Sequence, residues 1–121
     1  MMRMSRLILF VSDLDAMVNF YREKLGLAVI SGEGTGFVCL DGGGCQLALH
    51  ELPGGGKEKN PPPREDSYLK FVFYSKTVEE DAAKLKNQDV RMREIVRFGS
   101  IIMCDGIDPE GNIFQISSRE S

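Results

Sequence analysis

The second half of this 121-residue chain repeats the plan of its first half about 64 positions later. In each half an apolar strand leads into a helix, first over residues 6–27 and again over 70–90, so that Arg6 corresponds to Lys70 and Asp13 to Thr77. Three short apolar runs separated by Gly and Asp turns follow each helix and end in QLALHE and NIFQIS. Two β-α-β-β-β copies predict a duplicated fold that places equivalent side chains around a shared centre.

Length and charge limit the class of protein. A chain of 121 residues suits one domain with a sizeable core, and we expect module one at 4–52, a connector at 53–66 and module two at 67–118. The net charge of −3 and the lack of a basic face exclude general binding to nucleic acid or anionic membranes. Three cysteines without CxxC spacing and no signal-like apolar stretch favour a cytoplasmic protein.

Periodicity and turn residues predict the elements. The spacing of a capping box occurs twice, at Ser12 with Asp15 and at Thr77 with Glu80. The first predicted helix follows Ser12 and ends at Gly26, and the second covers 77–87. Strands are predicted at 6–11, 28–31, 36–40, 45–51, 69–75, 90–97, 100–104 and 112–117. The connector, dense in Gly, Pro and charge, is either an exposed linker or a flap that closes over a ligand.

Two segments carry a family resemblance: FVSDLDAMVNFYREKLGL after the first strand and DPEGNIFQI before the end. With the duplicated plan, they make the chain resemble the vicinal oxygen chelate superfamily, which includes glyoxalase I, bleomycin-resistance proteins and extradiol dioxygenases. The resemblance implies an α+β fold of two βαβββ modules that form a cupped, partly open, barrel-like sheet, and frequently a homodimer. The alternative, a ferredoxin-like α+β sandwich, is disfavoured by the eight predicted strands.

The same resemblance assigns four positions to metal ligands, on the first and last strand of each module. Here they hold Arg6, Ala48, Lys70 and Gln115. Arginine has no lone pair to offer, alanine has no donor atom, and lysine would have to lose its proton beside a cation. Because Gln115 with His50 makes a poor site, we expect no metal and no cofactor.

Strand alternation predicts which side chains line the cavity. One set comes from the first strand of each module: Arg6, Ile8, Phe10, Lys70, Val72 and Tyr74. The other set comes from the last strands: Gln46, Ala48, His50, Ile113, Gln115 and Ser117. Apolar walls with two cations suit a small organic anion, so the predicted ligand-binding residues are Arg6, Phe10, Gln46, Lys70 and Gln115.

Several of these residues have a second interpretation. Arg6 and Lys70 are either ligand contacts or cations paired with Glu94 or Glu110. His50 is either an idle surface imidazole or the best general base in the chain, and Tyr74 is a wall residue or a hydrogen-bond donor. The cysteines are interpreted as small buried hydrophobes, and Asp105 and Asp108 as turn formers.

Three functions follow in order of preference. The first is a glyoxalase/bleomycin-resistance-like protein that binds a small anionic molecule in a metal-free cavity. The second is a metal-independent lyase, isomerase or epimerase that uses His50 or Tyr74 as acid and base and Arg6 or Lys70 to stabilise an oxyanion. The third is a metal-dependent lyase or dioxygenase. The expected partners are a small-molecule ligand and a second copy of the chain.

Overall fold

The computed structural model describes residues 1–54 and 58–121, and the chain divides into two compact units, Met1–Lys59 and Asn60–Ser121. The boundary falls within the predicted connector, so each predicted module lies in its own unit. The assembly of both modules into one domain stays a prediction. No helix in the described residues is long and apolar enough to cross a membrane.

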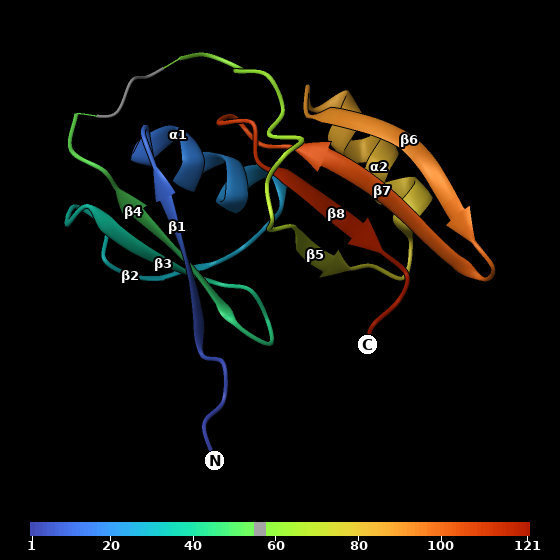
Figure 1. Ribbon diagram of the computed structural model, residues 1–121, viewed down its shortest axis with the longest axis horizontal. Helices are drawn as coiled ribbons and strands as arrows, with labels where there is room; N and C mark the ends of the chain where they lie inside the picture. Colours follow the sequence, from blue (N-terminus) through green and yellow to red (C-terminus); the bar gives the residue numbers. More distant parts are fainter. Residues whose placement is uncertain (55–57) are drawn as a thin grey trace. The chain divides into compact units, whose positions relative to one another are not determined.

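Module one is a helix packed on a four-stranded sheet (Figure 1). Its sheet has the strand order β1-β4-β3-β2, with β1 and β4 parallel and the other pairs antiparallel. The helix continues beyond its α-helical part as a π-helical segment. The elements are β1 (Arg6–Val11), α1 (Leu14–Asn19), η1 (Phe20–Lys24), β2 (Val29–Ser31), β3 (Phe37–Asp41) and β4 (Gln46–Glu51).

Module two repeats this topology in the order β5-β8-β7-β6, with β5 and β8 parallel. The parallel registers pair Ile8 with Ala48 and Val72 with Gln115, which reproduces the offsets of 64 and 67 between the sequence repeats. The predicted α+β class and the two βαβββ modules are therefore confirmed. The elements are β5 (Phe71–Tyr74), α2 (Val78–Asn87), β6 (Arg91–Phe98), β7 (Ile101–Ile107) and β8 (Ile113–Ser117).

The starts of both helices differ in detail from the predicted capping boxes. Asp13, not Ser12, is the N-cap of α1, and its Oδ1 accepts a hydrogen bond from the Ala16 amide at 3.2 Å. Thr77 is the N-cap of α2 as predicted, but its hydroxyl donates to Asp81 and its side chain caps no backbone amide. The prediction of Ser12 as an N-cap and that of a capping bond from the Thr77 side chain were wrong. Short polar side chains near a helix start have several acceptors within reach, and spacing alone does not choose between them.

Each sheet has one face against its helix and one face without a helix, which we call the open face. In β1 the alternation is the predicted one: Leu7, Leu9 and Val11 are the more buried set and Arg6, Ile8 and Phe10 the exposed set. β5 follows the same rule, with Phe71 and Phe73 more buried than Val72 and Tyr74. The helix-side cores contain side chains that are completely or almost completely buried, among them Met17, Tyr21, Leu40, Leu49, Cys104 and Phe114.

The second part of the predicted connector is fastened to module two. The Arg64 amide donates to the Gly111 carbonyl at 2.8 Å, and Arg91 Nη1 donates to the Pro61 carbonyl at 3.0 Å. These bonds hold residues 60–64 against the predicted turn at 108–112, where the buried Asp108 carboxylate accepts the amides of Glu110 and Asn112. The connector prediction for residues 55–57 lies outside the described residues.

This attachment gives a stability prediction at Gly111. Its φ is +86°, and a Cβ added there would lie 2.6 Å from the Pro62 carbonyl oxygen. We expect Gly111→Ala to lower the free energy of unfolding by about 2–3 kcal/mol, because backbone strain and a steric clash add together. Gly34 is the matched control: its φ is +82° with open space around the added Cβ, so Gly34→Ala should cost about 1 kcal/mol. Urea denaturation measures both, and equal losses would contradict the prediction.

Candidate functional site

The open face of module one carries a row of three rings with a guanidinium beside it. The register of β4 with its neighbours places His50 between Phe10 and Phe37. The His50 ring centroid lies 5.6 Å from that of Phe10 and 5.2 Å from that of Phe37. Arg6 Cζ lies 5.9 Å from the Phe37 centroid, over the ring face. A guanidinium over an aromatic face is a favourable cation–π contact. We call Arg6, Phe10, Phe37 and His50 the module-one cluster: a row of rings with a positive charge at one end.

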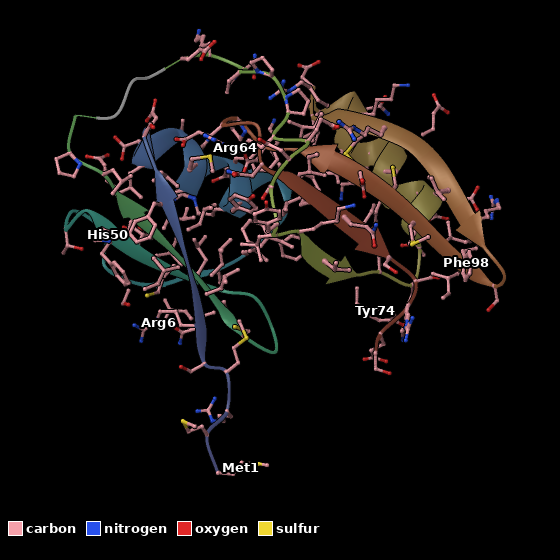
Figure 2. The ribbon with its side chains drawn as sticks, in the orientation of Figure 1. Met1, Arg6, His50, Arg64, Tyr74 and Phe98 are labelled. Atoms are coloured by element: carbon pink, nitrogen blue, oxygen red, sulfur yellow. The ribbon has the colours of Figure 1, made fainter. Side chains whose placement is uncertain are left out.

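The predicted residues of module one are therefore brought together. Gln46 pairs with Arg6 across the parallel strands, and Ala48 pairs with Ile8 at the centre of the face. Ala48 is fully buried, whereas Ile8 and Phe10 remain 44% and 56% exposed. Figure 2 shows Arg6 and His50 on the strands of this sheet. The surface can contact an apolar body and an anionic group at the same time.

Arg6 and His50 differ in what surrounds them. No carboxylate in the described part of module one lies within ion-pairing distance of Arg6, so none of them neutralises the charge that an anionic ligand would contact. His50 is half-buried between rings, and no hydrogen bond among the described residues orients its imidazole. A general base is usually oriented by a second polar group. The geometry therefore favours His50 as part of the platform.

Module two places its predicted residues around a carboxylate that sequence reasoning misassigned. Asp105 Oδ2 accepts from Lys70 Nζ at 3.0 Å, and Asp105 Oδ1 accepts from Gln115 Nε2 at 3.0 Å. The interpretation of Asp105 as a turn former was wrong, because β7 extends to Ile107 and pairs Asp105 with Gln115. The partner of Lys70 is likewise Asp105 and not the predicted Glu94 or Glu110. Continuing the strand prediction past residue 104 would have removed the turn assignment of Asp105, although it would not have revealed its contacts with Lys70 and Gln115.

Two hollows lie along the open face of module two. The first, of about 650 Å³, is lined by Arg93, Glu94, Val96, Met103, Asp105 and Gln115. The second, of about 440 Å³, shares Met103 and Gln115 with it and reaches Tyr74 and Phe98. Figure 2 shows Tyr74 and Phe98 towards the same end of this module. The predicted Tyr74 thus lines a hollow, while Phe98 was not among the predicted site residues.

The charges around the first hollow are uneven. Arg93 forms an ion pair with Glu65, and this hydrogen bond raises the pKa of the Arg93 guanidinium above its ordinary value, with smaller contributions from the charges of Glu65 and Asp105. Glu94 forms no ion pair within residues 1–54 and 58–121. With Lys70 compensated by Asp105, the lining of this hollow carries an excess of negative charge.

The four positions assigned to metal ligands do not fit a divalent ion. Ala48 has no donor atom and Arg6 no free lone pair. The Lys70 ammonium donates to Asp105 and has no lone pair, and the Gln115 Nε2 also donates to Asp105, so the neutral Oε1 of Gln115 is the one ligand atom that these four positions offer. Within the described residues, no three His, Cys, Asp or Glu side chains are grouped for metal binding. The metal-free cavity stays a prediction, supported by the chemistry of these side chains.

Another hollow lies on the helix side of module one and collects none of the predicted residues. It has a volume of about 680 Å³ and is walled by α1, the 33–36 turn and the ends of β3 and β4. Arg22, which lines it, is 3.6 Å from Glu33, and the Glu51 carboxylate accepts from the Leu14 amide. The polar groups of Arg22, Glu33 and Glu51 are thus already partnered, and the open faces, which carry the predicted residues, are the better candidate for a ligand site.

Comparison with known families decides the wider class. Residues 3–116 match the sequence pattern of the Glyoxalase/Bleomycin resistance protein/Dioxygenase superfamily. The protein belongs to this superfamily. Among curated protein sequences, none matches the chain.

Solved structures of superfamily type share the fold. A lactoylglutathione lyase from Agrobacterium tumefaciens is 20% identical with a TM-score of 0.72, covering 95% of this chain and 92% of its own. TnmS3, an antibiotic binding protein from Streptomyces sp. CB03234, is 20% identical with a TM-score of 0.74, covering 96% and 94%. An integron cassette protein of the V. cholerae mobile metagenome is 26% identical with a TM-score of 0.70, covering 97% and 94%. These likenesses show the fold of this superfamily member.

The site also gives a prediction for cysteine reactivity. Cys104 is buried beside Asp105, and burial, with the charges of Asp105 and Glu94, raises the pKa of its thiol. Because the thiolate is the reactive form, Cys104 should alkylate only above the ordinary pH range for thiols or after unfolding. The half-buried Cys45 should react first. Iodoacetamide labelling followed by peptide mass spectrometry measures both rates across pH, and equal labelling at pH 8 would contradict the prediction.

Proposed function

We propose that this superfamily member binds a small organic anion with an apolar body in a metal-free site, and that Arg6 contacts the anionic group. The observation that carries the proposal is the module-one cluster, in which the Arg6 guanidinium lies over the Phe37 ring, with Phe37 and Phe10 on either side of His50. The cluster combines a charged donor with an exposed ring surface on adjacent strands.

The physical chemistry of Arg6 suits this role. A guanidinium presents a planar set of donors that matches a carboxylate and stays charged at every physiological pH. Its neighbour Phe37 holds the group through the ring face without neutralising it. Because Phe10 and Ile8 leave much of their apolar surface exposed beside it, a ligand with an apolar body would gain from covering them. Gln46 adds an amide next to Arg6.

The relatives support a binding role without deciding it. One structural neighbour carries the name of an antibiotic binding protein and another that of a lyase, so both classes occur on this fold, and fold alone does not choose between them. The donor set disfavours the metal-dependent alternative. The unoriented imidazole of His50 disfavours the metal-independent lyase, isomerase or epimerase. The homodimer and the cytoplasmic location stay predictions.

The proposal predicts the effect of removing the Arg6 charge. Benzoate is a suitable probe, because it joins a carboxylate to a ring. We expect Arg6→Gln to weaken benzoate binding about tenfold or more, since a charge-assisted hydrogen bond is lost, as measured by calorimetric or NMR titration. Arg3→Gln is the matched control at an exposed arginine before β1, and its affinity should equal that of the unchanged protein. Equal affinities in all three proteins would refute the role of Arg6.

Two further measurements separate binding from catalysis and from metal chemistry. A His50→Ala variant should keep the Arg6-dependent affinity within a few fold, because His50 contributes ring contact only. Product signals in NMR screens of organic acids that disappear in His50→Ala, with binding retained, would instead establish the enzyme.

Thermal shifts with Zn²⁺, Ni²⁺ or Fe²⁺ should be absent in the folded protein. Stabilisation by one of these ions that disappears in Gln115→Ala would overturn the metal-free site.

A further inference from the structure

We propose that Asp105 keeps the open face of module two from binding anions by masking Lys70. Anion binding then depends on Arg6 of module one and not on the equivalent cation of module two. This inference rests on the proposed function. It gives a specificity-determining role to a residue whose sequence pattern indicated only a turn.

The masking is a matter of direct contact. Both oxygens of the Asp105 carboxylate are used: Oδ2 accepts from Lys70 Nζ and Oδ1 from Gln115 Nε2, each at 3.0 Å. The Asp105 side chain is 21% exposed and that of Lys70 43%. Two residues that sequence analysis assigned to ligand binding therefore already share one partner, and the positive charge of Lys70 is balanced within the protein.

An anion that approaches Lys70 meets a penalty that is absent at Arg6. It must either displace Asp105, which breaks a formed ion pair, or lie beside Asp105, which brings two negative charges together. Among the described residues of its own module, the uncharged ring face of Phe37 is the one ring or charge contact of Arg6. The two positions are equivalent in the duplicated fold, yet Arg6 forms no ion pair with the described residues, whereas Lys70 is paired with Asp105.

The surroundings of Asp105 act in the same direction. Asp105 and Glu94 both line the hollow of about 650 Å³, and the one arginine in its lining, Arg93, is paired with Glu65. Asp105 and Glu94 also lie close enough to Cys104 for their charges to add to the effect of burial, which is the main cause of the raised pKa of its thiol. An anion in this hollow would be repelled, whereas a hydrogen-bond donor would be accepted.

A four-protein cycle tests the masking, with titrations of benzoate and of inorganic phosphate. The proteins are the unchanged chain, Asp105→Asn, Lys70→Gln and the double variant Lys70→Gln/Asp105→Asn. We expect Asp105→Asn to bind both anions about fivefold to tenfold more tightly, because it removes the competing charge and frees Lys70. Lys70→Gln should not bind either anion more tightly. The double variant should have an affinity within about twofold of that of the unchanged protein, because positions 70 and 105 together carry no net charge in either of these two proteins.

Three results would contradict the masking of Lys70 by Asp105. The inference is overturned if Asp105→Asn fails to tighten phosphate binding, if the gain persists when Lys70 is also replaced, or if Lys70→Gln loses as much benzoate affinity as Arg6→Gln. Asp105→Ser serves as a second charge-removing variant, and thermal denaturation confirms that each protein is folded. Failure of the proposed function is recognised separately: Arg6→Gln then leaves benzoate binding unchanged, while the Lys70-dependent gain in phosphate binding survives.

Discussion

The parallel pairing of the first and last strands within each module is the constraint on which the other features depend. It brings residues about 40 positions apart into adjacent rows, Ile8 beside Ala48 and Val72 beside Gln115. Since side chains alternate between the faces of a strand, one register fixes the composition of a whole face. A slip by one residue would bury Arg6 and expose Leu7. The candidate site exists because this register puts the charged and aromatic side chains opposite the helix.

Much of this arrangement could be predicted from the sequence. The repeat revealed the fold, and the alternation in RLILFV and KFVFY separated open-face from helix-side residues correctly. Such patterns are strong because they follow from burial, which acts on every residue of a strand. The positions equivalent by repeat offset are also equivalent in the structure, so Arg6, Gln46, Phe10 and His50 were correctly placed on one face.

What the sequence did not reveal depends on contacts between strands that no local pattern encodes. Asp105 follows a predicted strand and precedes a turn, and aspartate is common in turns. Only the pairing of β7 with β8 shows that its carboxylate faces Gln115 and reaches Lys70. The helix caps were misassigned for a similar reason, since several polar side chains compete for the same amides. The attachment of residues 60–64 to the 108–112 turn likewise needed the fold.

Each module closes its own sheet and carries its own helix, and no strand pair in the described residues joins the two halves. A substitution on one open face therefore leaves the backbone pairing of the other half intact. After a gene duplication, such halves are free to diverge separately in chemistry while their scaffolds stay alike. The two copies in this chain differ in this way: equivalent positions hold a guanidinium with no ion pair among the described residues in the first copy and a neutralised ammonium in the second.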